Sequence, residues 1–344
     1  MIVLDLSLNS IYGFNCFHIN FTYPKKIRNS IIEDENLQGR ERFRYRKAVI
    51  LMGANATGKT SLGKALFRIF SYMNDGNPLP LYEMITGTRG EFSIDFVNGD
   101  YRLQRFSAVI IPAENKIDIR YMNAKIGLMD SYEKCVSNLK DCTVQVTENI
   151  TTMKNMIGNI RCRFSYPEIE KTQNLTDFNR MIFLKTLRAV VGTLDPTLQD
   201  IRIAKDLKDT FIIHRDNDEI IIQDGKLLNR EVLSSGTAEG IEVAVFIASM
   251  IAKQSTFYYC DEHFSYIQSD IEKRIFGIML DRLQGDEQLI FTTHNMDMLD
   301  LNLPKHSYIF LRKIKESGSY GVSAVSASDI LKRNTDSVRC AAEK

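Results

Sequence analysis

Features that define several protein classes are missing from this sequence. No segment reaches the roughly 18 consecutive apolar residues that a membrane-spanning helix needs. The longest apolar run lies at 243–252, and Ser249 interrupts it. Residues 1–5 form no basic leader and carry an acid early, so they predict a first strand and not a signal peptide. We therefore expect a globular, cytoplasmic protein that makes no membrane contact.

Cysteine spacing and net charge exclude further classes. The six cysteines form no C-x-x-C pair, which argues against a zinc ribbon and a disulfide framework, so we expect reduced, mostly packed thiols. The formal net charge is +1, and no global field therefore draws the chain to nucleic acid or to a membrane. Outside the motifs described below, no acidic cluster and no His/Asn/His arrangement suggests a nuclease centre.

The chain has 344 residues, of which 44% are hydrophobic, enough for one large domain or two modest ones. Apolar runs, and alternation of apolar and polar residues, predict strands. The expected strands cover residues 2–6, 17–21, those around Val49, 92–96, a run from Tyr101, 211–214, 219–223, 256–260, 289–292 and 308–311. We expect the last three to alternate with helices. Asn98-Gly99 predicts a tight hairpin, because this pair readily adopts positive φ.

A helical region is expected in the middle of the chain. Between residues 127 and 161, apolar residues recur at steps of three and four, which predicts one long amphipathic helix or a broken pair. Apolar positions between 178 and 187 predict another helix that could pack against it, with Pro167 near the bend. Two interpretations stay open: a helical subdomain that lies on the core, and a short projecting coiled coil.

A phosphate-binding loop is the most informative motif. Residues 53–60 read GANATGKT directly after the apolar run 48–52, and they match G-x-x-x-x-G-K-[ST]. Such a loop points backbone N–H groups and a helix N-terminus at phosphate oxygens, so the chain is predicted to bind ATP. Lys59 would reach the β- and γ-phosphates, and Thr60 would hold Mg²⁺. The predicted nucleotide-binding residues here are Gly53, Asn55, Ala56, Thr57, Gly58, Lys59, Thr60 and Ser61.

An acidic pair follows a later apolar strand. The run 256–260 leads directly into Asp261 and Glu262. A P-loop enzyme needs one carboxylate in the Mg²⁺ shell, the role predicted for Asp261, and another that polarises the attacking water, the role predicted for Glu262. Both motifs would have to converge on one metal ion.

Two more motifs complete a recognisable set. Residues 233–237 read LSSGT before a stretch compatible with a helix, and His294 follows the apolar strand 289–291. Together with Asn55 and the acidic pair, the sequence resembles the ABC-type ATPases. Among them it is similar to the soluble SMC, RecF and OLD-like heads of DNA repair and bacterial defence, and less to transporters. The resemblance covers about residues 1–125 and 190–315.

The resemblance implies an α/β fold. The expected architecture is a P-loop NTPase head of ABC type, with a mixed sheet, an antiparallel β subdomain and a helical insertion. On this basis the chain divides into residues 1–125 and 191–344, which form the head, and 126–190, which form the insertion.

The resemblance also implies a composite site between two copies of the chain. In the family, two heads sandwich two ATP molecules, so Ser234 and Gly236 would touch nucleotide held by the partner copy. His294 would contact the γ-phosphate in its own copy and act in catalysis with Lys59 and Glu262. Departures occur at Ala56, at Ser235 and Thr237 of the signature, and at the Q-loop, for which Gln104 is the candidate.

One local basic stripe could bind nucleic acid. Arg40, Arg42, Arg44 and Arg46 alternate with other residues, so an extended segment would place four guanidinium groups on one face. The alternative is a solvated edge strand whose charges discourage aggregation.

The leading functional hypothesis is an ATP-hydrolysing dimeric switch that acts on DNA or RNA, or controls a separately encoded nuclease or toxin. One rival is the ATPase subunit of a membrane transporter, disfavoured because a long stretch separates Lys59 from Ser234. The other rival is a nucleoside or small-molecule kinase, which would need no signature and no switch histidine.

Overall fold

The N-terminal alternating segments form an antiparallel sheet in the order β2-β1-β6-β7-β8-β9. Its strands are β1 (Ile2–Asn9), β2 (Phe17–Asn20), β6 (Gly90–Val97), β7 (Arg102–Ile111), β8 (Lys116–Lys125) and β9 (Lys140–Asp141). The predicted hairpin is confirmed, since β6 pairs with β7. Its loop is wider than a two-residue turn, because Gly99, Asp100 and Tyr101 all have positive φ and the last pair joins Val97 to Leu103.

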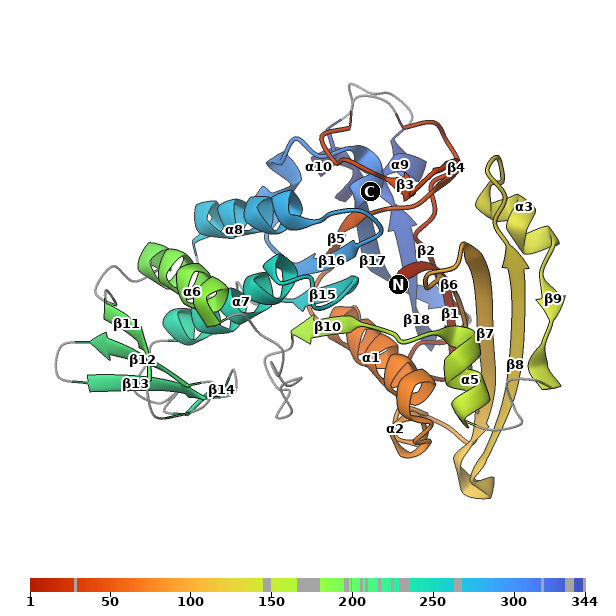
Figure 1. Ribbon diagram of the computed structural model, residues 1–344. Coiled ribbons are helices and arrows are strands. Elements are labelled where there is room, and N and C mark those ends of the chain that lie inside the picture. The colour runs from red at the N-terminus through yellow and green to blue at the C-terminus, as the bar shows by residue number, and fades with distance from the viewer. Residues whose placement is uncertain are drawn as a thin grey trace. The chain divides into compact units, whose positions relative to one another are not determined.

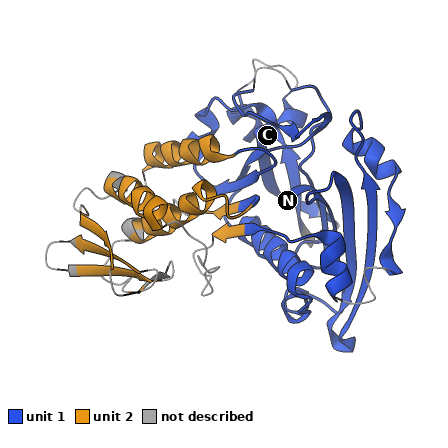
Figure 2. Cartoon of the chain, viewed as in Figure 1, with its two compact units in different colours: residues 1–162, 256–258, 284–344 blue, residues 163–255, 259–283 orange. Residues whose placement is uncertain are grey.

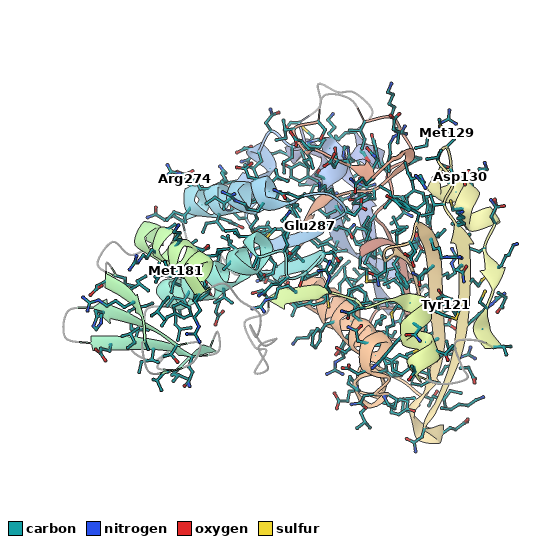
Figure 3. All side chains as sticks on the ribbon, in the orientation of Figure 1. Tyr121, Met129, Asp130, Met181, Arg274 and Glu287 are labelled. Atoms are coloured by element: carbon teal, nitrogen blue, oxygen red, sulfur yellow. The ribbon has the colours of Figure 1, made fainter. Side chains whose placement is uncertain are left out.

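These strands belong to a computed structural model whose elements are labelled in Figure 1. The structure describes residues 1–344 except 28–29, 145–149, 166–179, 195–197, 199, 205–206, 208–209, 216–217, 224–225, 229–234, 263–267, 317–318, 332–336 and 343–344. The chain forms two compact units, coloured in Figure 2. Unit 1 comprises residues 1–162, 256–258 and 284–344, and unit 2 comprises residues 163–255 and 259–283. Side chains fill the interior of each unit (Figure 3).

The P-loop strand belongs to a mixed sheet in the order β10-β15-β16-β5-β17-β18. Its strands are β5 (Ala48–Met52), β10 (Cys162–Ser165), β15 (Phe257–Asp261), β16 (Gln288–Thr293), β17 (Tyr308–Glu316) and β18 (Ser319–Ser326). Strand β5 runs parallel to both β16 and β17, whereas β17 and β18 are antiparallel. All five residues of β5 are buried, as an uninterrupted apolar run in a parallel sheet predicts.

Unit 1 contains short elements besides its sheets. The helices and 3-10 turns are α1 (Lys59–Asp75), α2 (Leu79–Tyr82), η1 (Pro112–Glu114), α3 (Tyr132–Ser137), α5 (Ile150–Ile157), η3 (Met296–Asp300), η4 (Lys305–Ser307), α9 (Ala327–Ile330) and α10 (Arg339–Ala342). A small two-stranded sheet pairs β3 (Asn36–Leu37) with β4 (Arg40–Arg44). The predicted alternation with helices fails after β16, because the described residues between β16 and β17 form only the 3-10 turns η3 and η4.

Of the two alternatives expected for residues 127–161, one long helix is wrong, and the described residues instead form separate helices, as the broken-pair alternative expects. Helix α3 ends at Ser137, strand β9 follows at 140–141 and pairs with β8, and α5 covers Ile150–Ile157. Cys135 in α3 joins a buried apolar cluster with residues of the antiparallel sheet, including Leu4. The apolar spacing therefore serves packing on this sheet and not a continuous helix.

In the part of unit 2 that the structure describes, there are three helices and a separate four-stranded antiparallel sheet. The helices are α6 (Arg180–Leu194), α7 (Ser235–Ile251) and α8 (Ser269–Arg282), and the sheet has the order β11 (Asp200–Ile203), β12 (Thr210–Arg215), β13 (Asp218–Gln223) and β14 (Lys226–Leu227). The predicted antiparallel pair over 211–223 is confirmed. The second predicted helix exists as α6, but it packs on α7 and on the small sheet, where the Phe183 and Phe211 rings lie 4.4 Å apart. The divisions of the chain at residues 125 and 190 stay a prediction.

Candidate nucleotide-binding site

The P-loop connects β5 to α1 through a strained backbone. Gly58 caps α1 with φ 94° and Ala56 has φ 60°, values in the left-handed region that favours glycine. At Gly53 an added Cβ would lie 2.7 Å from the Leu311 carbonyl oxygen and 2.5 Å from Thr57 Oγ1. The loop therefore needs glycine at both ends of the motif, as the sequence pattern predicts.

Lys59 lies beneath this loop. Only 4% of the residue is exposed, and its ammonium donates hydrogen bonds to the carbonyl oxygens of Gly53 at 2.5 Å and Ala54 at 3.2 Å. Thr57 Oγ1 also donates to the Ala54 carbonyl, at 2.8 Å, which closes the turn. Because Gly58 carries no side chain that could cap α1, the helix start is the kind of place where an anion binds. Thr60 and Ser61 are half-buried in this first turn.

Sheet register brings His294 beside the P-loop. Met52, the last residue of β5, pairs with Thr293 on one side and Phe310 on the other. Gly53 follows β5 and His294 follows β16, and the parallel register places both level with Leu311 of β17. His294 is exposed there, whereas Thr293 is buried.

A cavity of about 540 Å³, here called the P-loop cavity, lies at this edge. Its walls come from the loop, from the segment after β16, from β17 and from α10. These residues are Met52, Gly53, Ala54, Thr57, His294, Met296, Phe310, Leu311, Arg312, Lys313 and Ala342. Arg312 and Lys313 add two cations to the cavity, and no described residue that lines it is an acid. This charge suits a polyanionic ligand.

The basic wall and α10 were not predicted from the sequence. Phe310 and Leu311 belong to an expected strand, and the signal for Arg312 and Lys313 is only that two cations follow that strand. The strand order places them beside Gly53, and strand order could not be read from the sequence. Ala342 lies far along the chain from every motif.

The acidic pair lies in unit 2. Asp261 is the last residue of β15 and is only 1% exposed. Glu262 has φ 42°, an uncommon backbone conformation for a residue with a side chain and one often found at functional sites. Burial raises the pKa of the preceding thiol, Cys260, well above its usual value, and Asp261 and Glu272 raise it further. The roles of Asp261 as metal ligand and Glu262 as general base stay predictions.

The signature segment is described only in part. Ser234 lies outside the described residues, and Gly236 is half-buried in the first turn of α7, in unit 2. The structure thus brings the P-loop and His294 to one cavity in unit 1, and it places the acidic pair and Gly236 in unit 2. The contact of Ser234 and Gly236 with a partner's nucleotide stays a prediction.

Two secondary candidates have other roles. Gln104 is 3% exposed, and its side chain bonds to the Ile157 carbonyl and to the hydroxyl of Tyr121, which Figure 3 labels, so it is a buried structural residue and not part of the P-loop cavity. The prediction that Arg40, Arg42, Arg44 and Arg46 share one face is wrong for Arg46. Arg46 is 5% exposed and donates to buried acceptors, while Arg42 is exposed and Arg40 stacks over the Tyr101 ring at 4.3 Å.

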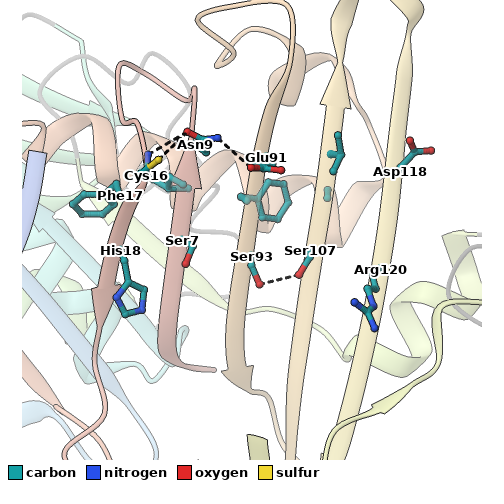
Figure 4. A pocket seen from close by; sticks show the side chains of 14 residues that line it. Ser7, Asn9, Cys16, Phe17, His18, Glu91, Ser93, Ser107, Asp118 and Arg120 are labelled. Atoms are coloured by element: carbon teal, nitrogen blue, oxygen red, sulfur yellow. Dashed lines mark hydrogen bonds between the residues drawn. The ribbon is translucent and has the colours of Figure 1, made fainter. Parts of the chain in front are cut away.

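The outer face of the antiparallel sheet holds another cavity, of about 470 Å³ (Figure 4). Its floor includes Ser93 and Ser107, which hydrogen bond at 2.8 Å. Glu91 and Asp118 line it and would repel a triphosphate. Arg120 also lines this cavity, so its charge is mixed, whereas no described residue that lines the P-loop cavity is an acid.

No metal-binding group of three or more His, Cys, Asp or Glu residues occurs in the described part of the chain. All six cysteines are free thiols, of which Cys135 and Cys260 are buried, while Cys16 and Cys340 are exposed. His18 and His306 each contact a carboxylate, of Asp5 and of Glu35, rather than one another. Among the described helices, none has the length and apolar character to span a membrane.

Comparison with known proteins identifies the fold. No family model matches the chain, and no curated protein matches it. An SMC head solved in complex with the C-terminal winged-helix domain of ScpA superposes with a TM-score of 0.58 at 12% identity, covering 97% of this chain and 100% of that one. An SMC head with an extended coiled coil, bound to the C-terminal domain of ScpA from Pyrococcus furiosus, gives 0.57 at 12% identity over the full length of both chains.

These likenesses agree with the mixed sheet, the antiparallel sheet and the P-loop described above. Because sequence identity is only 12%, they establish the fold alone. The chain has the α/β fold of an SMC head domain.

Proposed function

We propose that this protein is a Mg²⁺-dependent ATPase in which two copies of the chain close on ATP, so that it acts as a nucleotide-gated switch. The observation that carries the proposal is the P-loop cavity, where Lys59 lies beneath a glycine-dependent loop and His294 opens onto the same space. The fold of an SMC-type ATPase head supports the assignment.

The residues around the P-loop cavity fit a triphosphate. Residues 54–56 are exposed, so their backbone and the start of α1 would offer N–H groups, and Arg312 and Lys313 offer cations. Lys59 would exchange its bonds to the Gly53 and Ala54 carbonyls for bonds to β- and γ-phosphate oxygens.

Each side chain named from the sequence would have its own role in ATP hydrolysis. Thr60 and Asp261 would hold Mg²⁺, which would neutralise charge that builds up on the transferred phosphoryl oxygens. Glu262 would accept a proton from the attacking water, and His294 would hydrogen bond the γ-phosphate. In the proposed dimer, Ser234 and Gly236 of one copy contact the nucleotide that the other copy holds. ATP would therefore stabilise the dimer until the ATP is hydrolysed.

The proposed output is control of DNA or RNA, or of a separately encoded nuclease or toxin, in DNA repair or anti-phage defence inside the cytoplasm. Protein partners are supported by the two SMC heads, which were solved bound to domains of ScpA. Arg42 and Arg44 at the surface of β4 are the candidates for contact with phosphates.

Glu262→Gln tests the proposal. The variant should bind ATP but hydrolyse it at least roughly 100-fold more slowly, because the general base is removed. It should accumulate as a dimer with ATP and return to monomer with ADP, measured by multi-angle light scattering beside a phosphate-release assay. Glu133→Gln, an exposed acid of α3, is the control and should behave as wild type.

Two results would contradict this account. Equal turnover in wild type and Glu262→Gln would remove the role given to Glu262. A variant that stays monomeric at saturating ATP, while wild type hydrolyses ATP as a monomer, would remove the dimeric switch.

A further inference from the structure

We propose that residues 337–342, here called the C-terminal clip, position His294 in the P-loop cavity, with Arg339 as the positioning residue. The inference rests on the proposed function, because His294 matters only if the cavity binds nucleotide. No sequence motif points to this segment. Its contacts with both sides of the cavity carry the argument.

The first contact joins the clip to η3. Arg339 Nε donates to Asp300 Oδ1 at 2.7 Å, and its Nη2 donates to Asp300 Oδ2 at 2.5 Å. The same Nη2 reaches Asp297 Oδ1 at 3.4 Å. The planar guanidinium thus grips one carboxylate with two bonds and touches a second, an arrangement that fixes orientation as well as distance.

The turn η3 begins at Met296, two residues after His294, and short bonds hold the residues on either side of His294. Asn295 N donates to Thr293 Oγ1 at 3.0 Å, and Asn295 Oδ1 accepts a bond from Asp297 N at 3.0 Å. On the interior side, the Tyr308 hydroxyl lies 3.1 Å from the Met298 carbonyl oxygen and donates to it. The turn is therefore held by Tyr308 from inside and by Arg339 from outside.

The second contact joins the clip to the basic wall of the cavity. Arg312 Nη2 donates to the carbonyl oxygen of Ala341, which is fully buried. Arg312 itself lines the P-loop cavity, and so do Ala342 and His294. The clip therefore bridges Arg312 of β17 and the turn η3, which follows β16, and β16 and β17 lie on either side of β5.

Because the ion pairs of Arg339 are exposed, a positioning role for Arg339 can be tested without unfolding the protein. The side chains of Arg339, Asp297 and Asp300 are 41%, 50% and 48% exposed. Exposed ion pairs add little to folding stability. Loss of Arg339 should therefore leave the protein folded and release η3 on its outer side, which frees His294 to move away from the phosphate position.

The experiment compares Arg339→Ala, Arg339→Lys and the charge swap Arg339→Asp with Asp300→Arg, in the full chain. We expect Arg339→Ala to lower kcat for ATP roughly tenfold at unchanged KM, since a misplacement of about 1 Å can cost up to about 100-fold. Arg339→Lys, which keeps the charge and loses the fork, should recover part of kcat. The charge swap should recover more, because it rebuilds the pair.

A readout independent of turnover follows His294 directly. The imidazole signal of His294, assigned with His294→Gln, should shift or broaden in Arg339→Ala in NMR spectra recorded at one pH without nucleotide. Arg120→Ala is the matched control, because Arg120 also pairs with an acid at the surface, Asp141, at 3.2 Å, and lines no part of the P-loop cavity.

The outcomes separate the two proposals. If Arg339→Ala keeps wild-type kcat and leaves the His294 signal in place, the clip does not position His294. If wild type shows no turnover that depends on Lys59, the proposed function fails, and the His294 signal alone then confirms or refutes the clip.

Discussion

The two ends of strand β5 bury cations in different surroundings. At the P-loop end, Lys59 is 4% exposed, and it bonds to carbonyl oxygens of an exposed loop beside a cavity. At the other end, Arg46 is 5% exposed and donates to the Thr22 carbonyl at 3.3 Å, the Ser326 hydroxyl at 2.6 Å and the His306 carbonyl. The two residues are almost equally buried, but their acceptors differ in place. Those of Lys59 belong to one exposed loop, and those of Arg46 lie in three separate segments.

Under the proposed function Lys59 is a cation that binds phosphate, whereas the contacts of Arg46 are those of a structural cation. Carbonyl oxygens of a surface loop can be replaced by phosphate oxygens, because water satisfies them when the lysine leaves. The acceptors of Arg46 come from segments far apart in the sequence, and Glu35 and His306 close the same region with a contact of 2.5 Å. Burial lowers the pKa of Arg46 to about 10, yet its bonds make it a tie between segments.

The largest expected effect is at the P-loop end. Lys59→Ala should reduce ATP affinity or turnover by roughly 100-fold or more, because the loop loses the cation that would hold the β- and γ-phosphates. Folding stability should change little by comparison. Isothermal titration with ATP and thermal unfolding without ATP measure the two effects separately.

The control for Lys59→Ala is Lys64→Ala in the same helix, which should bind ATP as wild type does. If Lys59→Ala bound ATP normally, Lys59 would be a structural cation like Arg46, and the contrast between the two ends of β5 would be lost.

The reverse pattern is expected at the other end. Arg46→Ala should lower the free energy of unfolding by about 3 kcal/mol, because three buried acceptors lose their donor. The folded fraction should still bind ATP with wild-type affinity. Urea unfolding curves and ATP titration of the folded protein test both statements.

Lys47→Met is the matched control for Arg46→Ala. Lys47 is 1% exposed, burial lowers its pKa, and its ammonium has no hydrogen-bond partner among the described residues. Replacing such a group by an apolar side chain of similar size should leave stability unchanged or raise it. If Lys47→Met lowered the free energy of unfolding as much as Arg46→Ala does, the charge of these residues, and not their hydrogen bonds, would stabilise this end of β5.

The P-loop end was predictable from the sequence, because its signals are local. Gly58 is needed for its own positive φ, and Gly53 in part for the close approach of Thr57 four residues later, although Leu311 approaches it too. The apolar run 48–52 indicates a buried strand. The place of His294 near the P-loop was expected only from the resemblance to ABC-type ATPases, and the pairing of β16 with β5 brings it there. The basic wall depended on strand order, which no local pattern specifies.

The opposite end was mispredicted because its partners are distant. Alternation placed Arg46 on an exposed face with Arg40, Arg42 and Arg44, but acceptors from residues 306 and 326 draw it inside. The prediction for the middle of the chain was wrong for a related reason. The apolar spacing of residues 132–139 is the same for a long helix and for a short helix that packs on the antiparallel sheet, and tertiary contact decided for the second.

The smallest expected effect on stability concerns an exposed histidine–carboxylate pair, which can be compared with a buried one. His18 and Asp5 are in contact at 2.8 Å, with side chains 57% and 19% exposed, whereas His306 and Glu35 are 5% and 3% exposed. The hydrogen bond to Asp5 is the main cause that raises the pKa of His18 above 6.5. A raised pKa means that the stabilisation is complete below pH 6.5 and is lost as pH rises through the raised value.

His18→Gln should therefore be less stable than wild type by about 0.5 kcal/mol or less at pH 5.5, after solvent screening, and equal to it at pH 8.5. Asn20 keeps Asp5 paired at 2.7 Å in the variant, which limits the loss. Urea unfolding at both pH values measures the difference. A gap of the same size at pH 5.5 and 8.5 would mean that the imidazole acts through packing, and exposure would then not explain why this pair is weak.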